Sequence, residues 1–173
     1  MSHEWSRAGL IALLTVVCFG IAPVSAADQT SEGERSTGSP IMLMPSEVKW
    51  GPCPPAVPPG ALCSVIEGDL TAADKLFAFR LKMPDNYRIP PHFHPADEHL
   101  VVLSGVFNMG MGDTFDTNAG HAMPAGSFMV MPKEQPHFAW TKGETVIQVY
   151  AIGPWGLTYV NPEDDPRKRL PSE

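Results

Sequence analysis

The sequence predicts an all-β fold built from short strands, as in a barrel or a sandwich. Pro and Gly account for 19 and 15 of the 173 residues, and both punctuate short strands rather than favour long helices. Apolar runs bounded by turn residues begin about every eight to twelve residues, which is the spacing of an all-β domain. The length suits one domain, which we expect over residues 41–160.

The expected strands follow one another between turns. The clearest is Leu76–Met83, because its apolar residues alternate with the basic residues Arg80 and Lys82, as in a half-buried strand. Residues 41–50 are expected to form a first strand or an edge segment. The other expected strands cover residues 61–66, 88–94, 98–103, 106–111, 127–131, 136–141, 146–152 and 156–160, with one helical turn at 114–118.

Residues 1–26 have the pattern of a secretory signal peptide. The apolar run 10–21 is too short for a comfortable membrane span, and Arg7 precedes it. The Val-Ser-Ala sequence at 24–26 fits the rule of small residues at a cleavage site. Cleavage after Ala26 leaves a periplasmic or secreted protein with no stable membrane anchor, and an uncleaved anchor is the alternative.

The chain is acidic, and polar segments flank the predicted domain. A net charge of −7 argues against nucleic-acid binding, because few basic side chains are present to replace phosphate counterions. Residues 27–40 are small and polar and cannot bury a core, so we expect a disordered leader. Residues 161–173 are charged and interrupted by Pro, which predicts a charged C-terminal tail.

Cys53 and Cys63 are predicted to form a disulfide. Cys18 leaves with the signal peptide, so these two remain, ten residues apart, in an oxidising compartment. Two separate thiols are the alternative. A metal-binding role is weaker, since no second pair of Cys or His accompanies them.

Four side chains are predicted to bind a metal: His92, His94, Glu98 and His137. His92 and His94 lie two residues apart, so they project from the same face of a strand. The Pro-Ala-Asp sequence at 95–97 offers a tight turn that folds Glu98 back beside them on the next antiparallel strand. His137 follows a second turn that contains Pro, and we expect it to face the pair from another hairpin of a closed barrel.

Three imidazoles and one carboxylate suit a divalent transition metal such as Fe, Mn, Ni, Co, Cu or Zn. Four protein ligands on an octahedral ion leave two adjacent positions open for a small molecule. The ligand set carries one negative charge, so the centre keeps a positive charge that favours an anion. A closed, four-coordinate Zn site is the structural alternative. The catalytic residues are unknown, because no second carboxylate and no Ser–His pair marks a general base.

The two histidine-containing stretches resemble the two motifs of the cupin family. The first motif runs Gly, five residues, His-x-His, three or four residues, Glu, six residues, Gly. The second runs Gly, five residues, Pro-x-Gly, two residues, His, three residues, Asn. The matching positions are His92, His94, Glu98, Gly105, Gly126, Pro132 and His137. Motif glycines and the asparagine are replaced at Asn86, Glu134 and Thr141.

The resemblance covers about residues 60–155. It implies a double-stranded β-helix, or jelly-roll barrel, with a metal in the barrel mouth and commonly a homodimer. Cupins catalyse diverse reactions on small molecules, so it implies a dioxygenase or a metal-assisted lyase or isomerase. The alternative is a non-catalytic periplasmic module that binds a small ligand or a metal. Within the family, the chain is similar to small, exported, single-domain members.

The remaining histidines are predicted to lie away from the metal. His99 has the opposite parity to Glu98, so we expect it outside the barrel, packed or at a dimer interface. His121 precedes the second motif, where a solvated loop position is the simpler expectation and an acid–base role over the barrel mouth is the alternative. The apolar side chains expected to fill the core include Met109, Met111, Phe128 and Met131.

Overall fold

The structure is a computed structural model that describes residues 40–168. The predicted signal peptide, most of the predicted leader and the last five residues lie outside this range. Residues 41–168 belong to one compact unit. Within the described part of the chain, no helix has the length and apolar composition to cross a membrane.

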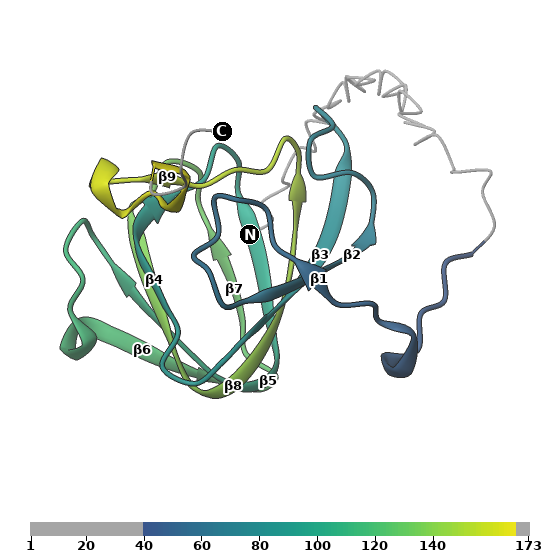
Figure 1. Ribbon diagram of the computed structural model, residues 1–173, viewed down its shortest axis with the longest axis horizontal. Coiled ribbons are helices and arrows are strands. Elements are labelled where there is room, and N and C mark those ends of the chain that lie inside the picture. Colours follow the sequence, from purple (N-terminus) through teal and green to yellow (C-terminus); the bar gives the residue numbers. More distant parts are fainter. Residues whose placement is uncertain (1–39, 169–173) are drawn as a thin grey trace, which may run out of the picture. The chain divides into compact units, whose positions relative to one another are not determined.

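Antiparallel strands make up the unit, with short 3-10 turns between and after them (Figure 1). The strands are β1 (Gly51–Pro52), β2 (Leu62–Glu67), β3 (Leu76–Met83), β4 (Arg88–Phe93), β5 (Glu98–Met111), β6 (Gly120–Pro124), β7 (Phe128–Met131), β8 (His137–Ile152) and β9 (Thr158–Tyr159). The 3-10 turns are η1 (Pro45–Glu47), η2 (Thr117–Ala119), η3 (Pro162–Asp164) and η4 (Pro166–Lys168).

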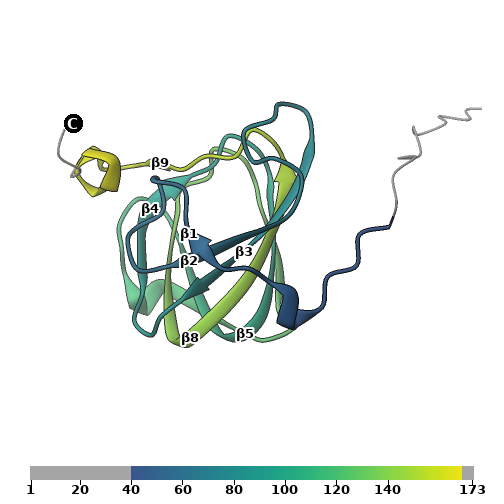
Figure 2. The ribbon, with the colours of Figure 1, turned by 45° about the vertical axis from the view of Figure 1, so that its right-hand side comes forward.

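The long strands β5 and β8 hold the barrel together. They pair from Met111 opposite His137 to His99 opposite Tyr150, with register shifts on both sides of Ser104 where the ladder bends. One path of the sheet runs β1-β2-β3-β8-β4-β9, while β6 and β7 pair with β5. Figure 2 shows the strands curling round a common interior. The predicted all-β jelly-roll barrel is confirmed.

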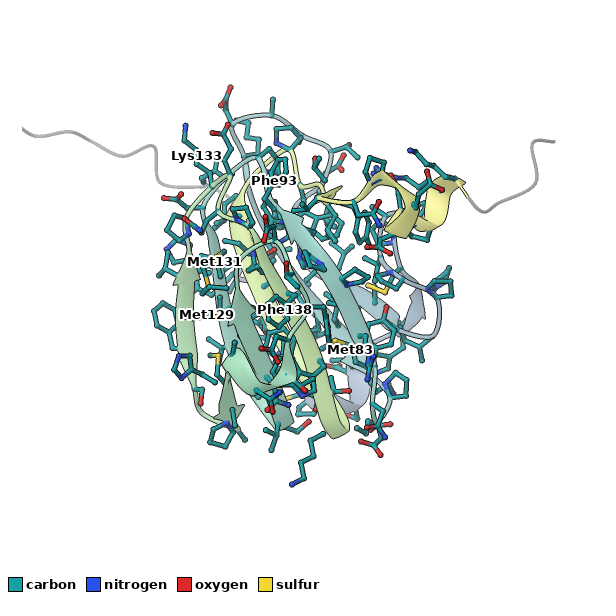
Figure 3. All side chains as sticks on the ribbon, turned by 90° about the vertical axis from the view of Figure 1, so that its left-hand side faces the viewer. Met83, Phe93, Met129, Met131, Lys133 and Phe138 are labelled. Carbon is teal, nitrogen blue, oxygen red and sulfur yellow. A yellow bond between two sulfur atoms is a disulfide. The ribbon has the colours of Figure 1, made fainter. Side chains whose placement is uncertain are left out.

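Alternating side chains of these strands fill the interior. In β3, Phe77 and Phe79 are 0% and 1% exposed, while the basic residues Arg80 and Lys82 that follow them stay partly exposed, so the predicted alternation is confirmed there. Ala78, between the two Phe residues, is buried as well. Met131 on β7 and Phe138 on β8, both labelled in Figure 3, are 3% and 0% exposed. The expectation that Met111 and Phe128 fill the core is wrong, because they are 48% and 55% exposed.

Several predicted boundaries are also wrong. The expected strands at 98–103 and 106–111 form one strand, β5, and those at 136–141 and 146–152 form β8. Gly105 and Gly143, with φ of 75° and 77°, let both strands bend without leaving the ladder. Residues 41–50 contain the turn η1 in place of a strand, and β6 was not predicted.

Two residues that replace motif glycines adopt the left-handed backbone conformation that glycine favours. Asn86 has φ of 57° and Glu134 has φ of 60°. Thr141, which replaces the motif asparagine, fixes the first of these turns. Its Oγ1 donates to the carbonyl of Pro84 at 2.6 Å and accepts from the amide of Tyr87 at 2.9 Å. The departures from the motif therefore preserve its turn geometry.

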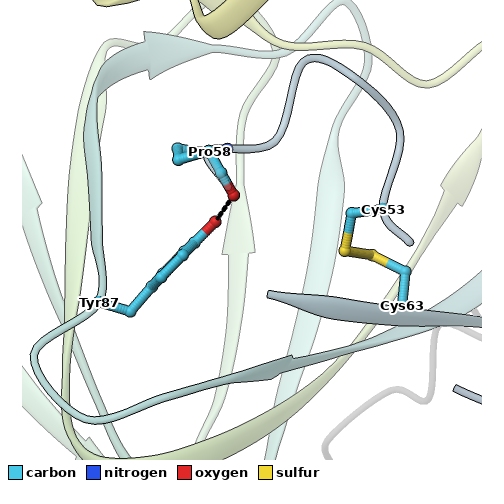
Figure 4. Close-up of a disulfide and its surroundings, with 4 residues drawn as sticks. All are labelled: Cys53, Pro58, Cys63 and Tyr87. Carbon is cyan, nitrogen blue, oxygen red and sulfur yellow. Dashed lines mark hydrogen bonds between the residues drawn. A yellow bond between two sulfur atoms is a disulfide. The ribbon is translucent and has the colours of Figure 1, made fainter. Parts of the chain in front are cut away.

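A disulfide and two tyrosines fasten the Pro-rich loop that follows β1. Cys53 and Cys63 are joined at an S–S distance of 2.06 Å, and the Tyr87 hydroxyl donates to the carbonyl of Pro58 (Figure 4). The Tyr159 hydroxyl donates to the carbonyl of Ala56 at 2.7 Å. The loop is thus hydrogen-bonded both to Tyr87, which directly precedes β4, and to Tyr159 of β9.

Candidate metal centre

Three histidines converge in the barrel interior. One ligand nitrogen from each of His92, His94 and His137 lies within 4.8 Å of the others. His92 on β4 stands directly opposite His137 on β8, with their ring centroids 4.3 Å apart. The His94 ring, just past the end of β4, lies 5.0 Å from the ring of His92 and 5.1 Å from that of His137. All three side chains are buried.

Glu98 joins this cluster from the start of β5. Its Oε2 lies 3.4 Å from Nε2 of His94, and the side chain is buried. The expected hairpin is wrong, because β5 pairs with β6, β7 and β8 whereas β4 pairs with β8 and β9. The turn at 95–97 instead carries the chain across the barrel, so Glu98 faces the histidines from another part of the sheet.

The turns before Glu98 and before His137 are hydrogen-bonded to each other. The amide of Glu134 donates to the carbonyl of His94 at 2.9 Å. The amide of Lys133 donates to Oδ1 of Asp97 at 2.8 Å. These bonds hold the two stretches that resemble cupin motifs in one arrangement, although 36 residues separate Asp97 from Lys133.

A backbone carbonyl fixes the tautomer of each clustered histidine. The Nδ1 atoms of His92, His94 and His137 lie 2.7, 2.8 and 2.9 Å from the carbonyl oxygens of Pro90, Gly156 and Gln135, respectively. A carbonyl accepts only, so each Nδ1 carries the hydrogen and each Nε2 keeps its lone pair. This is the orientation that metal-binding histidines adopt in proteins.

Burial keeps His92 and His137 uncharged. Burial, followed by the neighbouring His137 and His94, lowers the pKa of His92 well below its ordinary value. Burial also lowers the pKa of His137 to about 4. Neutral imidazole is the form that binds a metal. The donor set therefore fits a divalent transition ion with nitrogen and oxygen ligands.

Trp155 contacts this cluster and was not predicted from the sequence. Its indole Nε1 donates to Oε1 of Glu98 at 3.0 Å, and its ring meets that of Phe79 edge to face at a centroid distance of 5.1 Å. Its amide donates to the carbonyl of Leu70 at 2.7 Å. Trp155 lies in the loop between β8 and β9, outside both motifs, so no spacing pointed to it.

The four predicted ligands line a cavity of about 30 Å³. That volume accommodates an ion and little more, since one water needs roughly 10–15 Å³. The rest of the lining is almost entirely apolar and includes Phe79, Leu81, Ile89, Met109 and Leu157. A charge placed here is weakly screened by solvent, so its interactions are strong.

The two other predicted histidines lie outside this cavity. His99 faces outward, stacked on Tyr150 with centroids 5.2 Å apart. Its buried Nδ1 has no hydrogen-bond partner among residues 40–168. His121 lies on β6 opposite Met109, so the loop position expected for it is wrong. It is exposed and does not line the metal cavity.

Solved structures share this fold. The polyketide cyclase RemF from Streptomyces resistomycificus aligns with a TM-score of 0.60 at 18% identity, over 75% of this chain and 93% of RemF. The DMSP lyase DddQ from Ruegeria pomeroyi aligns with a TM-score of 0.53 at 22% identity, over 68% of this chain and 64% of DddQ. An RmlC-like cupin from Shewanella frigidimarina aligns with a TM-score of 0.51 at 13% identity, over 66% of this chain and 91% of that protein. At these identities the likeness shows the fold.

A curled antiparallel barrel with converging histidines, matched by cupin structures, gives this chain the cupin fold. Residues 44–166 also match the family model described as "Domain of unknown function (DUF4437)". The protein therefore belongs to this family. No curated protein gives a significant match to the sequence.

Proposed function

We propose that this protein is a metal-dependent enzyme acting on a small molecule, with His92, His94, Glu98 and His137 as the metal ligands. One observation carries the proposal. Each histidine has its Nδ1 committed to a backbone carbonyl, so three lone pairs and a carboxylate are directed into one buried space. A structural role for the histidines does not require all three to share that tautomer.

The reaction class we propose is dioxygenation, or metal-assisted lysis or isomerisation. A bound divalent transition ion supplies Lewis acidity, and a redox-active ion also supplies oxygen chemistry. The chain's own residues bind the ion, hold Glu98 through Trp155 and exclude bulk water through the apolar lining. The similar structures named as a cyclase and a lyase support the view that this fold serves several chemistries.

A non-catalytic periplasmic module that binds a metal or a small ligand is the second candidate. The observation that favours it is the small volume of the metal cavity, about 30 Å³, as expected for a closed site. A redox-inert Zn ion without exchangeable ligands supports this alternative. A redox-active ion that exchanges its solvent ligands supports the enzyme.

The test of the metal site is the metal content of the purified protein by mass spectrometry. We compare the wild type with the His92→Ala/His94→Ala variant and with His99→Ala as a matched control on the outer face. Near-stoichiometric Fe, Mn, Ni or Cu in the wild type and in the control, lost in the double variant, supports the proposal. Metal retained equally by the double variant contradicts the ligand assignment.

We also propose that the protein is exported to the periplasm or secreted. The support is the signal-peptide pattern of residues 1–26, together with a disulfide, since disulfides persist in oxidising compartments. The test is the N-terminal sequence of the protein recovered from each cell fraction. A mature chain that starts at Ala27 supports export, whereas an intact N-terminus in the cytoplasm contradicts it.

A homodimer is the assembly we propose. On the outer face, Phe128 and Val130 of β7 are 55% and 46% exposed, and the Phe128 ring lies 6.3 Å from that of His99. Exposed apolar patches of this kind mark association surfaces. Sedimentation of the wild type and of Phe128→Glu tests this. A dimer that dissociates in the variant supports the interface, and a wild-type monomer contradicts it.

A further inference from the structure

A second cavity, of about 420 Å³, opens beside the disulfide. This volume lies within the range of small-molecule sites. Its lining is mostly apolar and includes Pro52, the Cys53–Cys63 pair, Val65, Leu70 and Phe79. The metal cavity is much smaller, at about 30 Å³, so the molecule on which the metal acts needs space beyond it.

In the wall that β2 contributes to this cavity, the apolar side chain of Val65 is exposed to solvent. Val65 pairs with Phe79 of β3, so both side chains lie on the same face of the sheet. Phe79 is 1% exposed, whereas Val65 is 56% exposed. The interior layer that covers Phe79 therefore stops before Val65. An apolar ligand in the cavity would remove this surface from water.

Phe79 links the outer cavity to the metal centre, because it lines both cavities. Its ring packs edge to face against that of Trp155, which donates to Glu98. The amide of Trp155 also donates to the carbonyl of Leu70, in the wall of the outer cavity. Phe79 is thus the residue that borders both spaces.

The charges define which end of a ligand points inward. Asp69 lies on the outer cavity, where its Oδ1 accepts from the amide and the hydroxyl of Thr71, both at 2.8 Å. This carboxylate disfavours an anionic group at the outer end. A 2+ ion held by one carboxylate and three neutral imidazoles keeps a positive charge, which attracts an anionic oxygen at the inner end.

We propose that the outer cavity is the substrate pocket of the metal centre. It takes a small molecule with an apolar body, which covers Val65, and an anionic oxygen group, which passes Phe79 toward the metal. This inference rests on the proposed function, because it requires a metal with open positions.

The experiment uses the protein loaded with Co²⁺ and records the visible absorption of the ion. Azide serves as a probe that needs no pocket, and benzohydroxamate as a probe with an apolar body and an anionic oxygen group. The pocket is filled by Val65→Trp. The matched control is Leu62→Trp, also on β2 but on the opposite face and 41% exposed.

We expect Val65→Trp to weaken benzohydroxamate binding by at least about tenfold and to change azide binding by less than about twofold. Leu62→Trp should bind both probes as the wild type does. Azide binding without benzohydroxamate binding in the wild type, or equal benzohydroxamate affinity in Val65→Trp, overturns the pocket assignment alone. A wild type that binds no Co²⁺, or whose spectrum azide leaves unchanged, overturns the proposed function as well.

Discussion

The indole Nε1 of Trp155 donates to Oε1 of Glu98 at 3.0 Å, while the other carboxylate oxygen, Oε2, faces His94 Nε2 at 3.4 Å. The two oxygens therefore have separate partners. Because Oε1 is engaged by the indole, Glu98 is arranged to offer a single oxygen to a metal. The hydrogen bond also restricts rotation of the carboxylate group of the buried Glu98 side chain.

We predict that Trp155→Phe weakens metal binding about 10- to 100-fold, the usual cost of removing a group that orients a ligand. Competition with a chelator measures the affinity. Trp140→Phe is the matched control, because Trp140 is also partly buried but packs against Phe138 on a different part of the barrel. Equal affinities in the two variants would show that the indole does not position Glu98.

Gly105 is predicted to be the more sensitive of two glycines with nearly the same backbone conformation. Gly105 and Gly143 have φ of 75° and 77°, so Ala at either position costs about 1–2 kcal/mol from backbone strain. A Cβ at Gly105 would also lie 2.4 Å from the carbonyl oxygen of Glu144, whereas one at Gly143 meets nothing within 4 Å.

We therefore expect Gly105→Ala to lower the free energy of unfolding by at least about 2 kcal/mol more than Gly143→Ala. Urea unfolding of both variants measures the difference. Similar losses in the two variants would mean that the bend at Gly105 relaxes without cost.

Alkaline pH is predicted to destabilise the protein through its buried tyrosines. Burial, followed by the charge of Tyr159, raises the pKa of Tyr87, and burial also raises the pKa of Tyr159. The folded state therefore holds these protons more tightly than the unfolded chain, whose tyrosines ionise near pH ~10. The stabilisation is complete below that pH and is lost as the pH rises above it.

The free energy of unfolding measured across this range tests the prediction. Tyr87→Phe removes one of the two groups, so its stability should fall less steeply above pH ~10 than that of the wild type. Identical slopes would indicate that Tyr87 ionises freely in the folded protein.

Removing the disulfide is predicted to cost about 2 kcal/mol. The bridge closes a loop between residues ten apart, and the prolines that already stiffen this loop reduce the gain from closing it. Urea unfolding of Cys53→Ala/Cys63→Ala against the wild type measures this difference. Alkylation of the mature protein should find no free thiol before reduction and two afterwards. Two reactive thiols before reduction would rule the bridge out.

The clustering of the histidines was predictable from local rules. Residues two apart on a strand share a face, which brings His92 and His94 together. The positive φ at Asn86 also follows from a local rule, because asparagine tolerates this conformation at little cost. Both inferences depend only on residues that are close together in the sequence, so they can be made without knowing how distant strands pair.

Features that depend on distant pairing were not predictable in this way. The turn at 95–97 fits a hairpin, but β5 gains more pairing from β8, so the turn crosses the barrel. Phe128 was expected in the core because its side chain is large and apolar. Its pairing with Val101 instead directs this side chain outward. Trp155 reaches Glu98 across 57 residues through a loop that carries no repeating pattern.

His92 on β4 pairs directly with His137 on β8, so the metal ligands come together only when these two strands pair in the native register. A slip of one residue between β4 and β8 would turn one of the two imidazoles to the outer surface and dismantle the ligand set. A metal would therefore bind the natively registered barrel and not its slipped competitors. By mass action, free metal at one hundred times its Kd favours the native pairing by about 2.7 kcal/mol, so the ion acts as a selector of the correct fold.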